Sequence, residues 1–162
     1  MTNKKILIDW LNDAYRMEQT VVKILEGYEI DAEDYPEIVI IIRDQIKQTR
    51  KQSIVVRSEI ERLGGQIVES ESMELIDLTS PFQYTAGNID RDRVVKNAMT
   101  QHAFEHFNHA AYTALIKAAE FYNEPQTITI CHKIMAEDKE MAQTIQSKLS
   151  GLVERFLGKQ AN

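Results

Sequence analysis

Proline, glycine and cysteine are scarce in this chain. The 162 residues include three prolines, six glycines and one cysteine, Cys131. Small β-sandwiches and barrels turn every ten residues or so and normally carry more glycine and proline, so the scarcity argues against them. A single cysteine excludes an internal disulfide and a cysteine-rich zinc site. We expect Cys131 to be a small buried hydrophobe.

Basic clusters and long apolar runs are also missing. The formal net charge is −6 and the closest basic cluster is the pair Arg50-Lys51, so we expect neither nucleic acid nor an anionic membrane as a partner. The longest apolar run, residues 38–42, is far too short to span a bilayer. The N-terminal residues lack the apolar segment and cleavage site of a signal peptide. These features predict a cytoplasmic protein.

The sequence does contain long amphipathic helical patterns. Apolar residues recur with a helical period in four segments, at about 4–28, 34–63, 88–122 and 123–157. Residues 66–87 form a long connection with room for one short helix. The other connections are short, so we expect consecutive helices to lie antiparallel. The sequence therefore predicts a single all-α domain over residues 1–162, folded as an up-down-up-down four-helix bundle.

A polar residue interrupts each apolar stripe near the middle of its helix. The four interruptions are Glu18, Gln48, Glu105 and Glu137. The midpoints of antiparallel helices come to the same height, so these side chains are expected to converge on one layer of the core. Burying unpaired carboxylates is costly, because charge is removed from water. A metal, bound protons or hydrogen-bond donors must therefore compensate them.

Glutamines form a polar seam on the second helix. Gln45, Gln48 and Gln52 lie at helical spacing, which is typical of a solvated helix edge or of a buried hydrogen-bond ladder. A sharper interpretation makes Gln48 a substituted metal ligand whose amide donates a hydrogen bond to a facing glutamate. That bond would keep the core paired without metal.

Histidines cluster on the third helix. His102 and His109 are expected to share the inward stripe with Glu105, whereas His106 is rotated away. The inward histidines could bind a metal, or could bond to solvent or tyrosine. Dimetal bundles commonly use Glu-x-x-His pairs, and this sequence contains none.

Four segments together resemble a known family. They are LNDAYRMEQTVVKIL, QIKQTRKQSIVVRSEIERLGG, FEHFNHAAYTAL and MAEDKEMA, one from each expected helix. They resemble motifs of the bacterial ferritin-like family of the YciF/YciE type, small stress-linked proteins, over most of the chain. The resemblance implies a ferritin-like bundle, a homodimer, and a dimetal centre of iron or manganese. It also implies that Glu18, Glu105 and Glu137 match carboxylates of that centre.

The chain departs from the family pattern at several ligand positions. Gln45 and Gln48 replace a histidine and a glutamate of the second helix, and Asn108 replaces a glutamate of the third. In the fourth helix, Asp138 and Ala142 replace a glutamate and an aspartate. Two divalent ions bring four positive charges, whereas the retained layer offers three negative charges, or four if Asp138 turns inward. Hard cations prefer carboxylate-rich shells, so two metals are under-compensated.

We therefore predict a stress-related ferritin-like protein whose dimetal site has partly decayed. It would bind no metal or one, held by Glu18, Glu105, Glu137 and His109, with Gln48 as a substituted ligand, and it would have little or no catalytic activity. One alternative is a functional di-iron or di-manganese enzyme acting on peroxide or oxygen. Another is a purely structural bundle whose polar layer only specifies packing. The sequence identifies no catalytic residue and no small-molecule substrate.

A second apolar stripe runs along the third helix. It comprises Phe104, Phe107, Ala111, Leu115 and Ala118. Such a stripe can pack against a neighbouring helix of the same bundle or form the face of a dimer. Both possibilities agree with the homodimer that the resemblance implies.

Overall fold

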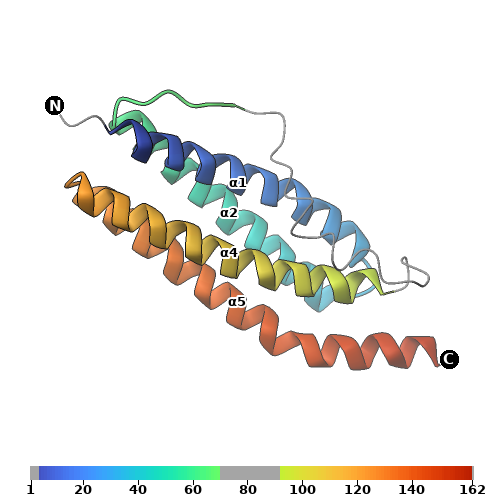
Figure 1. Cartoon of the computed structure of the whole chain (residues 1–162). Coiled ribbons are helices and arrows are strands. Elements are labelled where there is room, and N and C mark those ends of the chain that lie inside the picture. Colours follow the sequence, from blue (N-terminus) through green and yellow to red (C-terminus); the bar gives the residue numbers. More distant parts are fainter. Residues whose placement is uncertain (1–3, 70–91, 162) are drawn as a thin grey trace.

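The computed structural model describes residues 4–69 and 92–161, and these residues form four long helices (Figure 1). The helices are α1 (Lys5–Asp31), α2 (Pro36–Arg62), α4 (Arg93–Phe121) and α5 (Pro125–Gln160). α1 packs mainly on α2, and α4 packs mainly on α5. The molecule is therefore built from two helical hairpins laid against each other. The expected all-α four-helix bundle is confirmed.

Hydrogen bonds and ion pairs between helices fix their directions. Arg93 at the start of α4 pairs with Asp31 at the end of α1, so α1 and α4 are antiparallel. Arg155 near the end of α5 pairs with Glu37 at the start of α2, so α2 and α5 are also antiparallel. α2 and α4 consequently run in the same direction, and the order is up-down-down-up, where the sequence suggested up-down-up-down. The reason is that α2 ends and α4 begins at opposite ends of the bundle.

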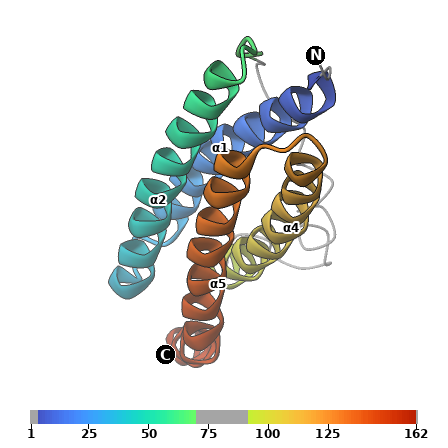
Figure 2. The same ribbon diagram turned by 90° about the vertical axis from the view of Figure 1, so that its left-hand side faces the viewer.

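Figure 2 shows the resulting arrangement of the ends. The start of α1, the end of α2 and the turn from α4 to α5 lie together at one end of the bundle. At that end the side-chain amide of Asn12 donates to the carbonyl of Gln66 (3.1 Å) and accepts from the backbone N–H of Val68 (2.9 Å). Asn12 thereby holds the first residues after α2 against α1.

The helix ends follow the residues that mark them in the sequence. Pro36 and Pro125 occupy the first positions of α2 and α5, where a missing N–H costs no hydrogen bond. Gly64 ends α2 with a left-handed φ of 78°, and Asn123 adopts a φ of 55° in the turn before α5. α5 continues through Gly158, where the sequence suggested a stop. The expected start of the third helix near Asn88, and most of the connection 66–87, fall outside the described residues.

The core has an apolar cluster at each end and a polar layer between them. The cluster at the end nearest the α4–α5 turn is centred on Leu7, Leu11, Val56, Ile60, Leu115 and Ile134. The other is centred on Leu25, Ile38, Ile42, Val94, Ala98 and Leu152. Cys131 is buried in the first cluster, as expected. None of the described helices is long and apolar enough to cross a membrane.

Candidate metal centre

Three carboxyl groups are buried between the two apolar clusters, each from a different helix. Glu18 of α1 is 0% exposed, Glu105 of α4 is 4% exposed, and Asp138 of α5 is 2% exposed. Glu18 and Glu105 lie in the layer that the sequence predicts. The second helix contributes amides to this layer, from Gln45 and Gln52, which are also buried.

Each carboxyl group has one oxygen with a hydrogen-bond donor and one without. Tyr112 donates its hydroxyl to Oε1 of Glu18 at 2.8 Å. Gln45 donates its side-chain amide to Oε1 of Glu105, and Gln52 donates to Oδ1 of Asp138 at 2.9 Å. The second oxygens of Glu18, Glu105 and Asp138 are buried without a hydrogen-bond partner. Buried polar atoms are normally bonded, so three orphaned carboxyl oxygens in one layer indicate a proton or a cation.

A short ladder of amides supports Glu105. Gln101 donates its side-chain amide to the carbonyl oxygen of Gln45, and Gln45 in turn donates to Glu105. The amide of Gln45 is thus fixed with its N–H toward the carboxyl group. This is the buried hydrogen-bond ladder that the glutamine seam predicted as one of its interpretations, with Gln45 and Gln52 in the roles considered for Gln48.

Burial raises the pKa of all three carboxyl groups. The pKa of Glu18 rises from 4.5 to about 8 through desolvation, then through repulsion by Asp138, while the Tyr112 hydrogen bond lowers it. The pKa of Glu105 rises to about 9 by desolvation and by repulsion from Asp138 and Glu18. The pKa of Asp138 rises from 3.8 to about 7 by desolvation and by repulsion from Glu137, partly opposed by hydrogen bonds from Gln52, Asn108 and Gln48. Near neutral pH, protons are therefore held in this layer in the absence of a cation.

The charge of the donor set falls short of what two divalent ions need. The orphaned oxygens of Glu18, Glu105 and Asp138, with the orphaned Oδ1 of Asn108, are the oxygen ligands that hard cations prefer. Three carboxylates cannot neutralise the four positive charges of two divalent ions. In the described part of the chain, no three His, Cys, Asp or Glu side chains are grouped so as to hold a metal ion. The amides of Gln45 and Gln52 occupy carboxyl oxygens that a metal would otherwise take.

Three residues proposed from the sequence lie outside the buried layer. Glu137 and Gln48 are half-buried, at the rim between α2 and α5, and His109 is exposed. Of the two histidines predicted to point inward, His102 is half-buried and His109 is exposed. The inward orientation expected for His109 is therefore wrong. Successive side chains on a helix point in directions about 100° apart. A small error in the expected rotation of α5 therefore exchanges Glu137 for the neighbouring Asp138 on the buried face.

Asp138 could have been found from the sequence by giving weight to small residues. Its helix buries Cys131, Ile134, Ala142 and Ile145, and Asp138 lies four residues after Ile134 and four before Ala142. Methionine is larger and more apolar than alanine, so the sequence alone favours Met141 over Ala142 as a core residue of this helix. Met141 is only half-buried in the structure.

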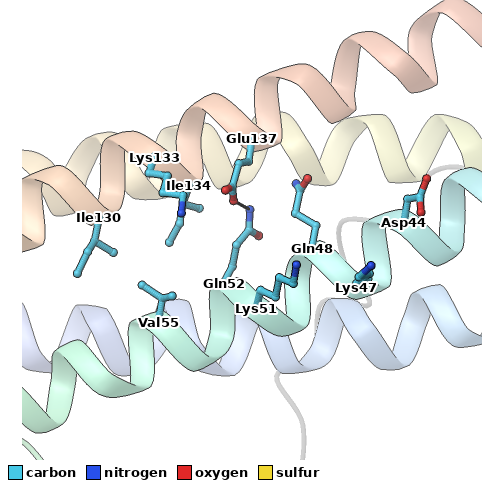
Figure 3. A pocket seen from close by; sticks show the side chains of 10 residues that line it. All are labelled: Asp44, Lys47, Gln48, Lys51, Gln52, Val55, Ile130, Lys133, Ile134 and Glu137. Carbon is cyan, nitrogen blue, oxygen red and sulfur yellow. Dashed lines mark hydrogen bonds between the residues drawn. The ribbon is translucent and has the colours of Figure 1, made fainter.

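A groove between α2 and α5 brings solvent close to the layer. It has a volume of about 520 Å³ and is lined by Lys47, Lys51 and Lys133 together with Gln52 and Glu137, among others. Figure 3 shows the amide of Gln52 directed at Glu137, and Nε2 of Gln52 lies 3.1 Å from Oε2 of Glu137. The same amide also donates to Asp138. Gln52 therefore separates the groove from the buried carboxyl groups by one side chain.

The chain was compared with known families and solved structures. Residues 2–158 match the family described as "Domain of unknown function (DUF892)". A protein of Xanthomonas campestris pv. campestris has a similar structure, with a TM-score of 0.84 and 28% identity over 100% of both chains. The E. coli stress protein YciF gives a TM-score of 0.77 at 14% identity, covering 95% of this chain and 99% of its own.

A bacterioferritin is also similar in structure. The Rhodobacter capsulatus protein, with a metal-free dinuclear site and haem iron, gives a TM-score of 0.76 at 15% identity, covering 96% of this chain and 89% of its own. At such low identity, YciF and the bacterioferritin establish the fold alone. The ferritin-like fold is confirmed, and so is the resemblance to the YciF/YciE type of protein that the sequence motifs suggested.

Proposed function

The chain belongs to the DUF892 family, and we propose that it is a ferritin-like protein whose dimetal-carboxylate site has partly decayed. In this proposal the layer of Glu18, Glu105 and Asp138 is compensated by amides and protons, or by a single divalent ion. The protein then has little or no catalytic turnover of its own.

The observation that carries this proposal is the direction of the glutamine amides. Gln45 and Gln52 present N–H groups to Glu105 and Asp138, so the second helix supplies donors where a dimetal bundle supplies ligands. An N–H directed at a carboxyl oxygen stabilises that carboxyl without metal. The glutamines bring no charge, so they cannot balance a second ion.

A single ion would require the carboxyl groups of the layer to draw closer together, because no three His, Cys, Asp or Glu side chains of residues 4–69 and 92–161 are grouped as metal ligands in this structure. Glu18, Glu105 and Asp138 would hold it, with the orphaned Oδ1 of Asn108 as a neutral donor. Iron or manganese would supply Lewis-acid or one-electron chemistry there when bound. The residues of the chain bind and neutralise the ion, Tyr112 orients Glu18, and the apolar clusters on both sides exclude water.

The experiment is a metal count per chain. Protein purified without chelator is analysed by mass spectrometry of its metals, then analysed again after anaerobic addition of Fe(II) and Mn(II). We expect at most one ion per chain, lost in Glu105→Gln and retained in Glu140→Gln, which alters an exposed carboxylate on α5. Two tightly held ions per chain would overturn the proposal in favour of a redox enzyme acting on peroxide or oxygen.

Three further parts of the proposal concern the protein in the cell. A role under stress is supported by the likeness to the E. coli stress protein YciF. A test compares survival of a deletion strain under peroxide and osmotic stress with that of the parent strain.

We also propose a cytoplasmic location and a homodimer. Exposed apolar side chains on α1 support the dimer, since Ile6 is 54% and Trp10 is 45% exposed, one turn apart.

A further inference from the structure

Two histidines on α4 bring their ring nitrogens together. His102 and His106 are one helical turn apart, and their Nε2 atoms lie 3.2 Å from each other. The ring centroids are 4.7 Å apart and the ring planes are inclined by 78°. The rings therefore meet in a T-shaped arrangement with their Nε2 atoms close together, and they do not stack face to face.

The backbone fixes the proton on one of these rings. Nδ1 of His102 lies 3.2 Å from the carbonyl oxygen of Ala142 on α5. A carbonyl only accepts, so Nδ1 of His102 carries the proton and, in the neutral ring, Nε2 presents its lone pair. A histidine whose second nitrogen donates to a backbone carbonyl has the supporting contact that is typical of metal-bound imidazoles.

His106 completes the pair from the exposed side of the helix. In the metal-free protein its Nε2–H donates to Nε2 of His102, which accounts for their separation. A shift of that proton to Nδ1 of His106 frees a second lone pair, on a nitrogen that lies 3.2 Å from the first. His106 is exposed, so water can bond Nδ1 after the shift.

We propose that His102 and His106 form a two-imidazole site for a divalent transition-metal ion such as Zn²⁺, Cu²⁺ or Ni²⁺. Imidazole nitrogens bind these ions at about 2.0–2.1 Å, and two nitrogens 3.2 Å apart then subtend about 100° at the metal. This angle is close to tetrahedral, so the separation of the two nitrogens fits a shared metal ion. The site uses neither of the glutamine amides and none of the orphaned carboxyl oxygens of the buried layer.

The pair borders a cavity of about 560 Å³ between α4 and α5. Glu105, His109 and Lys139 also line this cavity. No further His, Cys, Asp or Glu completes a group of three ligands with the pair in the described residues, so the remaining coordination positions are left to water or to a small anion. A site with two protein ligands exchanges its ion readily, in contrast to closed structural zinc sites.

The test uses Cu²⁺ and Zn²⁺ alone as probes. Titration calorimetry gives the affinity for Zn²⁺, and electron paramagnetic resonance of the Cu²⁺ complex reports nitrogen ligands directly. We expect His102→Gln and His106→Gln each to weaken binding by about tenfold or more and to reduce the nitrogen signature from two ligand nitrogens to one. His109→Gln is the matched control on the same cavity, and it retains both.

A second control separates this site from the buried layer. Glu18→Gln removes a carboxylate of the layer and leaves the histidine pair intact, so nitrogen-ligated Cu²⁺ must persist in it. Unchanged affinity and spectrum in His106→Gln would overturn the proposal. So would an equal loss in His109→Gln, or a loss in Glu18→Gln, because binding would then depend on other residues.

Discussion

The hydroxyl group of Tyr112 on α4 donates a 2.8 Å hydrogen bond to Oε1 of Glu18 on α1, and both side chains are completely buried. The bond joins the two helical hairpins across the polar layer. It is the one donor that the structure provides to Glu18 from the described residues. Burial and the neighbouring Glu18 raise the pKa of Tyr112 well above 10, so the phenol remains a donor throughout the physiological range.

Removing this donor should destabilise the fold without altering its architecture. Tyr112→Phe leaves Oε1 of Glu18 unpaired, and the loss of a buried hydrogen bond costs about 1–2 kcal/mol of unfolding free energy. Urea denaturation followed by circular dichroism measures the change. Tyr122→Phe, at the half-buried end of α4, should shift stability by less than about 0.5 kcal/mol. Equal effects in both variants would show that the bond to Glu18 contributes nothing specific.

Stability should fall as pH rises in metal-free protein. The folded-state pKa values of Glu18 and Glu105, about 8 and about 9, exceed the ordinary value of 4.5. The folded state therefore binds more protons than the unfolded state from about pH 4.5 upward, and this contribution is lost as pH rises through the folded pKa values. We expect the unfolding free energy to decrease between about pH 5 and about pH 9.

Denaturation in chelator-containing buffers across that range checks the trend. Glu18→Gln combined with Glu105→Gln removes both groups and should flatten the profile. A rise in stability with pH in the wild type would show that the layer is ionised and compensated in another way.

A single neutralising substitution should separate metal binding from folding. Glu105→Gln keeps an oxygen that accepts from the Gln45 amide while it removes the buried acid. At about pH 8 we expect a gain of about 1 kcal/mol in unfolding free energy, because a buried ionisable group no longer has to stay protonated. Metal content should fall at the same time. A stability gain with unchanged metal content would favour the purely structural interpretation of the layer.

The end of the bundle near the α4–α5 turn contains an ion network with a different character. Arg62 donates to both oxygens of the buried Glu59, at 2.7 and 2.9 Å, and to Glu124 at 2.6 Å. Thr127 donates a further bond to Glu59, and Lys4 pairs with Glu124. Both carboxylates are therefore fully bonded, unlike those of the central layer.

Removing the cation from this network should be strongly destabilising. Arg62→Met leaves Glu59 buried without its counter-ion, which costs about 3 kcal/mol or more. Arg57→Met breaks the exposed pair with Glu61 on the same helix and should cost less than about 1 kcal/mol. Thermal or urea unfolding of the two variants provides the comparison. Similar small losses would indicate that the network forms only weakly in solution.

The proposed homodimer can be tested through the exposed tryptophan. Trp10→Glu places a charge on the apolar face of α1 and should convert a dimer to monomer at micromolar concentration. Size-exclusion chromatography with light scattering measures the mass. Ile54→Glu, which alters an exposed apolar residue of α2, is the matched control. A monomeric wild type would contradict the dimer, and dissociation by Ile54→Glu alone would move its interface to α2.

The sequence predicts the helices well because each has an apolar stripe and some of their ends carry clear signals. Pro36 and Pro125 mark the helix starts correctly, and Gly64 marks the end of α2. The order of directions was harder to predict, since a long connection can return the chain to either end. The hydrogen bonds of Asn12 to Gln66 and Val68 hold the first residues of this connection against α1, and neither contact is visible as a sequence pattern.

The residues of the candidate site could be predicted only where the sequence shows which face of a helix points into the core. Glu18 and Glu105 lie in stripes that pack on both neighbours, so their inward orientation could be inferred. On α5 the small buried residues Thr127 and Ala142 give no strong apolar signal, which left the choice between Glu137 and Asp138 to tertiary packing. The contact between His102 and His106 depends on side-chain rotamers, which spacing does not determine.

The division into two hairpins gives the polar layer a role in assembly. Contacts within each hairpin join residues close in sequence, so each hairpin can form early. Glu105 and Asp138 both belong to the second hairpin, whereas the amides of Gln45 and Gln52 that relieve them belong to the first. Only when the hairpins dock do these groups lose water and gain their partners. Docking is therefore the step at which the chain takes up protons or an ion, and the rate of folding should depend on pH through that step.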